Sequence, residues 1–430
     1  MAQILSPRAR VAVLGAAMGG LLFDGLELGL MPVASLSVSR DLLGAAYTPT
    51  LGGDWFAWFT AALMLGAAVG GIYLGSLGDR IGRARALGVS ILFYSVFAGL
   101  GAFVRTQEQM LALRFVVGLG VGGVWPNAVA LAAECWPDKS RPIVAGVMGA
   151  ALNGGILMLS QIARTWHITP ESWRWIFKLA AAPAALGLLV LFALPESPLW
   201  LASRSRRREE ADASSNESSA SARRRRQSPV RELFRPPLLR LTLIGILLGS
   251  IPMIGAWAAS KWMIPWADKV GGATEAGYKA VTQGWWALGA VLGSFFGAQI
   301  AAWLGRRRAY ALISVGATVL TSLMFLGTAP LRVSFLPIVF AQGFVATLFF
   351  GWLPLYLPEL FPTHVRAAGS GIAYNVGRFA TALGVFAAGA LFAAVGGSYP
   401  KVGATCGLIY GVGLIAIWWA PDTTDKSLQD

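Results

Sequence analysis

The sequence predicts an all-α membrane protein, with twelve transmembrane helices arranged as two pseudo-symmetric six-helix bundles. Of the 430 residues, 56% are hydrophobic and only 13% are charged. The mean hydropathy of +0.61 lies well above the range of water-soluble domains. Apolar runs of about 20 residues recur along almost the whole chain, and a helix of that length crosses a hydrocarbon core of about 30 Å.

The apolar runs place the helices in order along the chain. We expect them at 11–36, 54–77, 86–104, 109–133, 142–163, 175–194, 238–262, 280–303, 308–328, 333–357, 367–391 and 402–420. The polar stretch 196–237 is too charged and too rich in serine to bury a core. It predicts a mobile linker between an N-terminal bundle over 1–195 and a C-terminal bundle over 238–430.

The basic residues gather in alternate connections, and this pattern predicts the orientation. With the N-terminus inside, the cytoplasmic side holds Arg8, Arg10, Arg80, Arg83, Arg85, Lys139, Arg141, the linker arginines, Arg306, Arg307, Arg308 and Arg366. The opposite loops carry only scattered cations. The positive-inside rule therefore predicts that both termini and the linker are cytoplasmic in a multi-pass protein of a bacterial-type inner membrane, surrounded by lipid.

Composition also excludes several functional classes. The net charge of +14 does not indicate nucleic-acid binding, because the Lys and Arg residues lie in loops and not along one helical face. Cys135 and Cys406 match no metal-binding or redox spacing, so we expect neither a metal nor a cofactor. The two histidines, His167 and His364, lie in predicted loops, and no nucleophilic triad or phosphate loop is present. We do not expect an enzyme.

An internal repeat supports the two halves. ECWPDKSR, which begins at Glu134, and ELFPTHVR, which begins at Glu359, share the pattern E-x-x-P-x-x-x-R at an offset of 225 residues. LGDRIGRAR is answered by AAWLGRRR, in which Gly305 and Arg306 stand for Gly82 and Arg83. Repeats of this kind are typical of secondary transporters.

The motif GSLGDRIGRAR at 75–85 resembles the cytoplasmic signature of the major facilitator superfamily. RFVVGLGVGG at 114–123, WRWIF at 173–177, LPESPLWL at 194–201 and the paired loops extend this resemblance over essentially the whole chain. It implies alternating access, in which the two halves rock around a site near the bilayer midplane. It also implies a conformational latch at the cytoplasmic side, made by Gly75, Asp79, Arg80, Gly82, Arg83, Glu134, Arg141, Glu196, Glu359 and Arg366.

Ionisable residues inside membrane helices are candidates for function because an unpaired charge there costs several kcal/mol. Asp24 lies about 21 Å of helical rise beyond Arg10, and Glu27 lies about 26 Å beyond it on the same face. Proton-coupled porters of the superfamily resemble this chain in having an acid here and an Arg near Arg114. The resemblance implies that Asp24 carries the proton with Arg114 as its counter-ion. Glu27 is the competing carrier, and a permanent structural ion pair in a uniporter is the alternative.

Arg378 is the most informative residue of the second half. It lies 12 residues beyond Arg366, and therefore about 18 Å into the membrane. The repeat maps it onto Asn153, which lies 12 residues beyond Arg141. Organic anion transporters of the superfamily resemble the chain here, and a substrate carboxylate would bind a guanidinium in fork geometry. The alternative is an internal partner such as Asp24 or Glu27.

Further candidate ligands lie near these positions. Tyr374 and Asn375 share a face with Arg378, although core packing explains them nearly as well. Trp257, Lys261 and Trp352 are also candidates, but aromatic residues at such depths are more often packing residues or interface anchors, and a lysine can snorkel.

Taken together, these features predict a transporter that moves a small organic anion, a carboxylate, together with protons, and that works as a monomer. A sugar:proton symporter is the alternative within transport, because PESP and RFVVGLGVGG would suit it. A non-transporting membrane nutrient sensor that signals through the linker is the alternative outside transport.

Overall fold

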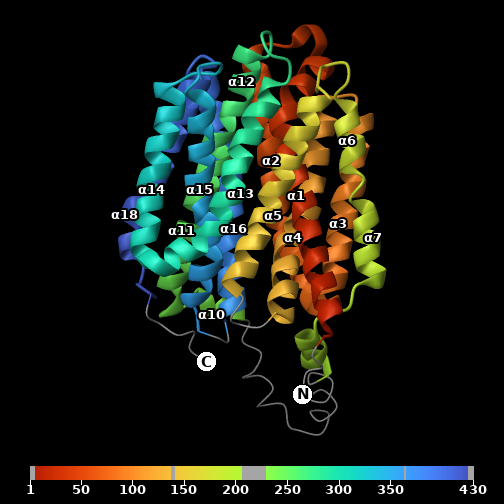
Figure 1. The fold of residues 1–430 in the computed structure, drawn as a ribbon, viewed down its shortest axis with the longest axis vertical. Helices are drawn as coiled ribbons and strands as arrows, with labels where there is room; N and C mark the ends of the chain where they lie inside the picture. The colour runs from red at the N-terminus through yellow and green to blue at the C-terminus, as the bar shows by residue number, and fades with distance from the viewer. Residues whose placement is uncertain (1–4, 137–140, 206–228, 363–364, 425–430) are drawn as a thin grey trace.

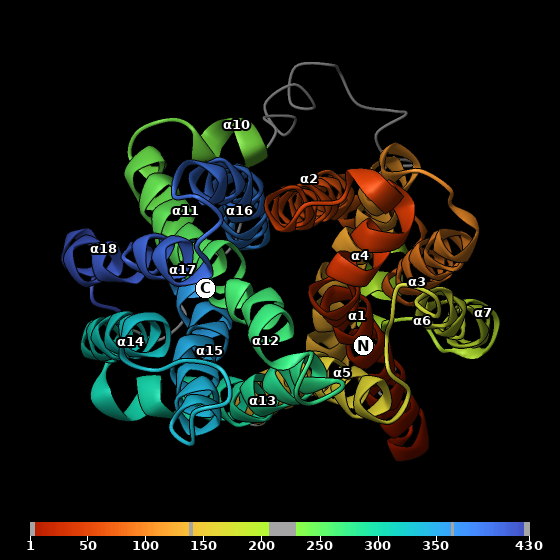
Figure 2. The same cartoon turned by 90° about the horizontal axis from the view of Figure 1, so that it is seen from above.

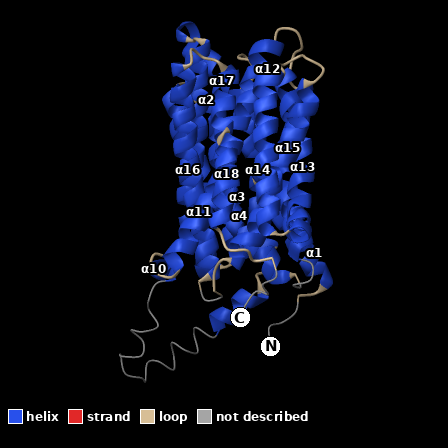
Figure 3. Cartoon of the chain, turned by 90° about the vertical axis from the view of Figure 1, so that its left-hand side faces the viewer, coloured by secondary structure: helices blue, strands red, loops and turns tan. Residues whose placement is uncertain are grey.

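The structure is a computed structural model that describes residues 5–136, 141–205, 229–362 and 365–424. Within these ranges it contains helices and loops but no β-strand (Figure 3). Twelve of its helical segments are long and apolar enough to cross a membrane. The predicted all-α fold with twelve transmembrane helices is confirmed.

The first six spans are formed by α1 (Pro7–Leu43), α2 (Pro49–Ile81), α3 (Arg83–Leu100), α4 (Gln107–Cys135), α5 (Arg141–Thr165), and the consecutive pair α6 (Arg174–Ala180) and α7 (Ala184–Ala193). Hydroxyl side chains cap the starts of three of them. Ser6 accepts a hydrogen bond from the α1 backbone, Thr48 from α2 and Thr106 from α4. Each cap satisfies a backbone N–H that the first helical turn leaves unpaired.

The last six spans begin with a broken helix, made of α11 (Leu238–Ile254), the π-helical turn η4 (Gly255–Ala259), the 3₁₀ turn η5 (Ser260–Trp262) and α12 (Met263–Gly271). This span is nine residues longer than the predicted helix 238–262. The others are α13 (Tyr278–Leu304), α14 (Arg306–Ser322) with η6 (Leu323–Gly327), α15 (Phe335–Glu359), α16 (Arg366–Ala394), and α17 (Tyr399–Gly407) with α18 (Ile409–Ala416) and η7 (Ile417–Trp419).

The two sets of six spans lie side by side, with the first six on one side of the molecule and the last six on the other (Figure 2). They meet where α2 packs against α16 and where α5 packs against α13. The start and the end of the described chain lie at the same end of the molecule, and α12 lies at the opposite end (Figure 1).

Glycines repeat the same close packing in both halves. An added Cβ at Gly66 of α2 would lie 2.1 Å from the carbonyl oxygen of Phe115 in α4, and one at Gly289 of α13 would lie 2.2 Å from that of Phe340 in α15. Only a residue without a side chain permits this approach between membrane helices. The internal repeat found in the sequence therefore corresponds to equivalent helix pairs.

The predicted linker is shorter than 196–237 at both ends. Residues 198–205 are helical, and the buried indole of Trp200 donates a hydrogen bond to the backbone carbonyl of Asp79 at 3.0 Å. At the other end, Pro229–Leu233 forms α10, in which Leu233 is fully buried. Apolar anchors inside a mainly polar stretch account for this difference. Residues 206–228 lie outside the described ranges.

Aromatic side chains close the molecule at the end opposite the termini. Trp262 of η5 contacts Phe56 of α2 with ring centroids 5.2 Å apart, and it stacks on Phe392 of α16 at 4.9 Å. Tyr399 of α17 packs on Phe392 at 4.7 Å. Because Phe56 belongs to the first half and the other rings to the second, this cluster joins the two halves there.

Candidate functional site

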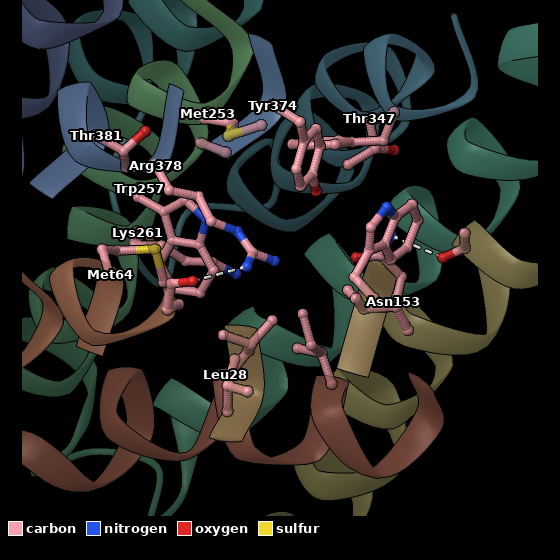
Figure 4. Close-up of a pocket in the computed structure, with 18 of the residues that line it drawn as sticks. Leu28, Met64, Asn153, Met253, Trp257, Lys261, Thr347, Tyr374, Arg378 and Thr381 are labelled. Atoms are coloured by element: carbon pink, nitrogen blue, oxygen red, sulfur yellow. Dashed lines mark hydrogen bonds between the residues drawn. The ribbon is translucent and has the colours of Figure 1, made fainter. Parts of the chain in front are cut away.

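A cavity lies between the two halves, about midway along the spans. Its wall is mainly apolar and aromatic. The polar or charged side chains that line it are Asn153, Lys261, Thr347, Tyr374, Arg378 and Thr381. The lining residues include two cations and no Asp or Glu. Figure 4 shows residues of both halves around this space, with Leu28 and Asn153 from the first half and Trp257 and Arg378 from the second.

Arg378 extends from α16 into the cavity (Figure 4). One guanidinium nitrogen donates to two backbone carbonyls of the first half, those of Ala67 at 3.2 Å and Gly122 at 3.4 Å. The guanidinium also lies 5.3 Å from the ring centroid of Tyr374. Within the part of the chain that the structure covers, it forms no ion pair with a carboxylate. The alternative of an internal ion-pair partner is thus not realised in this conformation.

Lys261 lies at the break in the seventh span and lines the same cavity. Its side chain is 1% exposed, and its Nζ has no hydrogen-bond partner among the described residues. The ammonium sits over the ring of Trp286 at 3.5 Å and lies 5.6 Å from the ring of Trp257. It therefore does not snorkel to the membrane surface but is held by cation–π contacts beside the cavity.

Gln342 of α15 holds this arrangement in place. Its carbonyl accepts from the Trp286 indole at 2.7 Å, and its amide donates to Ser260 at 2.7 Å. One buried amide thus positions both the ring beneath Lys261 and the residue before it. No sequence motif marks Gln342 or Trp286. The available signal for Gln342 is a polar amide inside an apolar membrane helix.

The cavity is also lined by Asn153 of α5, Trp125 of α4 and Tyr374 of α16. Asn153 donates to Ser294 of α13 at 2.8 Å, so the counterpart of Arg378 also faces the cavity but bridges the two halves. Trp125 of α4 and Tyr374 of α16 lie with their ring planes within 10° of parallel and their centroids 6.0 Å apart. Both residues line the cavity.

The buried acids of α1 differ from the prediction in their partners. Arg114 forms a buried ion pair with Glu27, and not with Asp24 as expected. Asp24 is 1% exposed, and neither of its carboxylate oxygens has a hydrogen-bond partner among the described residues. The charged groups that act on it electrostatically are Arg378 and Glu27. The longer side chain of Glu27, one turn further along the helix, reaches Arg114, and the shorter Asp24 remains near Arg378.

Two predicted ligands do not line the cavity. Asn375 packs on α2, where its side-chain oxygen lies 2.2 Å from where a Cβ on Gly71 would be. Trp352 is fully buried in the core of the second half, where it stacks on Tyr356 at 4.4 Å and donates to the carbonyl of Arg306. Trp352 lies close to the end of α15 that carries the latch, and this end is too far from the middle of the span for contact with a central ligand.

The predicted latch residues of the first half form a connected network. Arg83 forms ion pairs with Asp79 at 2.6 Å and with Glu134 at 3.2 Å. Ser197 donates to the second oxygen of Glu134 at 2.5 Å. The structure thus shows Asp79 paired within its own half.

The second half repeats this network with Arg306 and Thr423, which are not among the predicted latch residues. Arg306 binds Glu359 through two hydrogen bonds of 3.0 and 2.8 Å, and Thr423 donates to Glu359 at 2.5 Å. Thr423 corresponds to Ser197. This correspondence is visible in the sequence, where Pro-Glu-Ser begins at residue 195 and the similar Pro-Asp-Thr begins at residue 421.

The turns beneath both networks depend on equivalent glycines. Gly82 and Gly305 have φ angles of +112° and +85°, which disfavour any side chain. An added Cβ at Gly82 would also lie 2.0 Å from Glu196, whose carboxylate accepts from the backbone N–H of Ala84 at 3.0 Å. Glu196 therefore caps the first turn of α3.

A carboxylate also orders the corresponding turn in the second half. The Thr424 hydroxyl accepts from the backbone N–H of Arg306 at 3.1 Å and donates to Asp422 at 2.6 Å. This hydrogen bond lowers the pKa of the Asp422 carboxyl below its usual range. An ionised Asp422 is therefore the form that supports this cap.

The remaining predicted latch residues are placed as follows. Gly75 lets α2 pack on Pro126 of α4, at 3.2 Å from where its Cβ would be. Arg80 is exposed at the end of α2. Arg366 donates to the backbone carbonyl of Phe361 at 3.4 Å. The side chain of Arg141 lies outside what the structure describes.

Comparison with known proteins agrees with this architecture. Residues 12–430 match the family model described as "Sugar (and other) transporter". The chain is 29% identical to the "Cis,cis-muconate transport protein" of Acinetobacter baylyi, over 88% of this chain and 86% of the relative. It is 31% identical to the "Probable 4-methylmuconolactone transporter" of Cupriavidus pinatubonensis, over 86% of this chain and 82% of the relative.

A solved structure shares the fold. The inward open conformation of the xylose transporter XylE from E. coli superposes with a TM-score of 0.71 over 97% of this chain and 98% of that one, at 18% identity. The family model, the relatives and the twelve spans together show that the chain belongs to the sugar (and other) transporter family of the major facilitator superfamily and is a multi-pass membrane transporter.

Proposed function

We propose that this protein transports a small planar organic acid together with protons. The observation that carries the proposal is Arg378, a guanidinium that faces the central cavity without a carboxylate ion-pair partner among the described residues. Its contacts to two backbone carbonyls occupy one nitrogen and orient the group. A carboxylate supplies the bidentate anionic partner that such a guanidinium favours.

The shape of the wall and the relatives support a planar acid. Trp125 and Tyr374 offer nearly parallel flat faces, on which a conjugated ligand packs by offset stacking. Muconate and 4-methylmuconolactone, which appear in the names of two relatives, are both unsaturated carboxylic acids. The likeness to the xylose transporter concerns the fold alone.

Proton coupling is assigned to Asp24. Without substrate, the Asp24 carboxylate is the nearby negative charge that balances Arg378. When a substrate carboxylate binds Arg378, it balances the guanidinium charge in place of Asp24. Asp24 then takes up a proton and becomes neutral. The Glu27–Arg114 pair is a balanced pair beside this site and is assigned a structural role.

The remaining parts of the proposal follow from the arrangement of the chain. The two halves rock about the cavity, with the paired arginine–glutamate networks at the cytoplasmic side and both termini in the cytoplasm of the inner membrane. The proposal also includes transport by a monomer.

The test is uptake of labelled cis,cis-muconate and D-xylose into proteoliposomes, with and without an imposed pH gradient. We expect saturable muconate uptake that an inward proton gradient accelerates. Arg378→Gln should reduce it by more than about tenfold, since a charge-assisted hydrogen bond contributes about 1.5–3 kcal/mol. Arg332→Gln, an exposed arginine in the same half, is the matched control. Uptake of D-xylose without uptake of muconate would establish the sugar alternative instead.

A further inference from the structure

Lys261 is a buried cation that the proposed transport of a single carboxylate does not use. Its Nζ has no hydrogen-bond partner among the described residues, although the side chain is only 1% exposed and lines the cavity. An ammonium in such surroundings loses its hydration, and the rings of Trp286 and Trp257 replace only part of it. The Lys261 ammonium therefore has N–H donors that no described residue accepts, and it lies beside the cavity in which a ligand would bind.

The charges around the cavity are unbalanced. Lys261 and Arg378 are its two cations, and none of the residues that line it is acidic. Asp24, which acts electrostatically on Arg378, supplies one compensating charge when it is ionised. When Asp24 holds a proton, the wall presents two positive charges in largely apolar surroundings. A ligand with two negative charges would neutralise the two positive charges of this wall.

We infer that Lys261 forms a second anion subsite and that the preferred substrate is a dicarboxylate dianion. The inference rests on the proposed function, in which Arg378 binds the first carboxylate. The second carboxylate binds the Lys261 ammonium, and the conjugated skeleton between them packs against the aromatic wall. Binding of the dianion with one proton on Asp24 leaves the cavity electrically neutral.

The surrounding residues pre-position the subsite. Gln342 ties the Trp286 indole to Ser260, so the ring beneath Lys261 and the break in the seventh span are held together. A ligand therefore meets an ammonium whose location is already set, which lowers the ordering cost of binding.

The experiment compares two ligands that differ by one charge, cis,cis-muconate and its monomethyl ester. Equilibrium binding of each labelled compound is measured on purified wild type, Lys261→Met, Lys261→Arg and Lys269→Met. Lys269 is the matched control, because it lies on the same span but is exposed at its end. Thermal melting of each variant reports whether it is folded.

We expect wild type and Lys269→Met to bind the dianion at least about tenfold more tightly than the ester. Lys261→Met should weaken binding of the dianion by about the same factor and leave binding of the ester within about twofold, and Lys261→Arg should restore much of the preference. The second subsite would be overturned if Lys261→Met lost affinity for the dianion and the ester equally, or if the wild type bound both with the same affinity. Either result would leave the proposed function intact. If wild type bound neither compound but transported D-xylose, the proposed function itself would fail, and the subsite with it.

Discussion

The two halves of the transporter bury charge in different ways. In the first half, Glu27 and Arg114 neutralise each other at 1% side-chain exposure. In the second half, Lys261 and Arg378 face the cavity without an acid that lines it. A balanced pair neutralises its own charges, whereas a cation that faces a cavity without such a partner can bind an anion. In our proposal, this difference separates a structural charge pair from a ligand site within one pseudo-symmetric fold.

At the end of the molecule that carries the termini, the halves are alike. Arg83, Glu134 and Ser197 make the same contacts as Arg306, Glu359 and Thr423. In the cavity the repeat is broken, because Asn153 of the first half corresponds to Arg378 of the second.

The largest expected effect contrasts the balanced pair with the unbalanced cation. Glu27→Gln leaves Arg114 buried without its anion and should lower the free energy of unfolding by about 3–5 kcal/mol. Arg378→Gln removes a guanidinium that forms no carboxylate ion pair among the described residues and acts on Asp24 without a hydrogen bond, so it should lower the free energy of unfolding by only about 1 kcal/mol. Denaturation of both variants in the same detergent compares them. Equal destabilisation would show that the two halves bury charge in equivalent ways.

A smaller effect separates Asp24 from Glu27. Asp24→Asn should abolish accumulation of substrate driven by a pH gradient, while exchange of labelled for unlabelled substrate continues. The wild type gains up to about tenfold accumulation per coupled proton for each pH unit imposed. Proteoliposome uptake and counterflow measure the two activities. Normal accumulation in the mutant would contradict the assignment of the proton to Asp24.

The smallest effects concern the two arginine–glutamate networks. Ser197→Ala and Thr423→Ala each remove one donor to a glutamate and should each lower the free energy of unfolding by about 1 kcal/mol. Equal values would sharpen the view that this end is symmetric. Ser205→Ala, at an exposed helical position, serves as the control. A large difference between the two network variants would show that the networks are not equivalent.

Predictions from the sequence were most accurate where a single local property decides the outcome. Apolar length located the twelve spans, and the repeated E-x-x-P-x-x-x-R pattern located the glutamates of both networks. Helical rise matched the depth of Arg114 better to Glu27 than to Asp24, whereas the resemblance favoured Asp24 as its partner. The structure pairs Arg114 with Glu27.

Side-chain direction explains the other differences. Trp352 and Asn375 were candidates by depth and spacing, but one turns into the core of its own half and the other onto Gly71. Trp286 and Gln342 had no motif to identify them. They matter because a break in the seventh span brings Lys261 over the Trp286 ring.

The sequence by itself determined that the chain crosses the membrane twelve times, that it consists of two related halves, and that it carries charge at depths where charge is costly. These properties follow from hydropathy, repeat spacing and the rise of a helix, all of which are local along the chain. The tertiary structure alone decided which charges are paired and which remain available to a ligand. Pairing depends on distances of a few ångströms between side chains of different helices, and only the packing of the helices sets those distances.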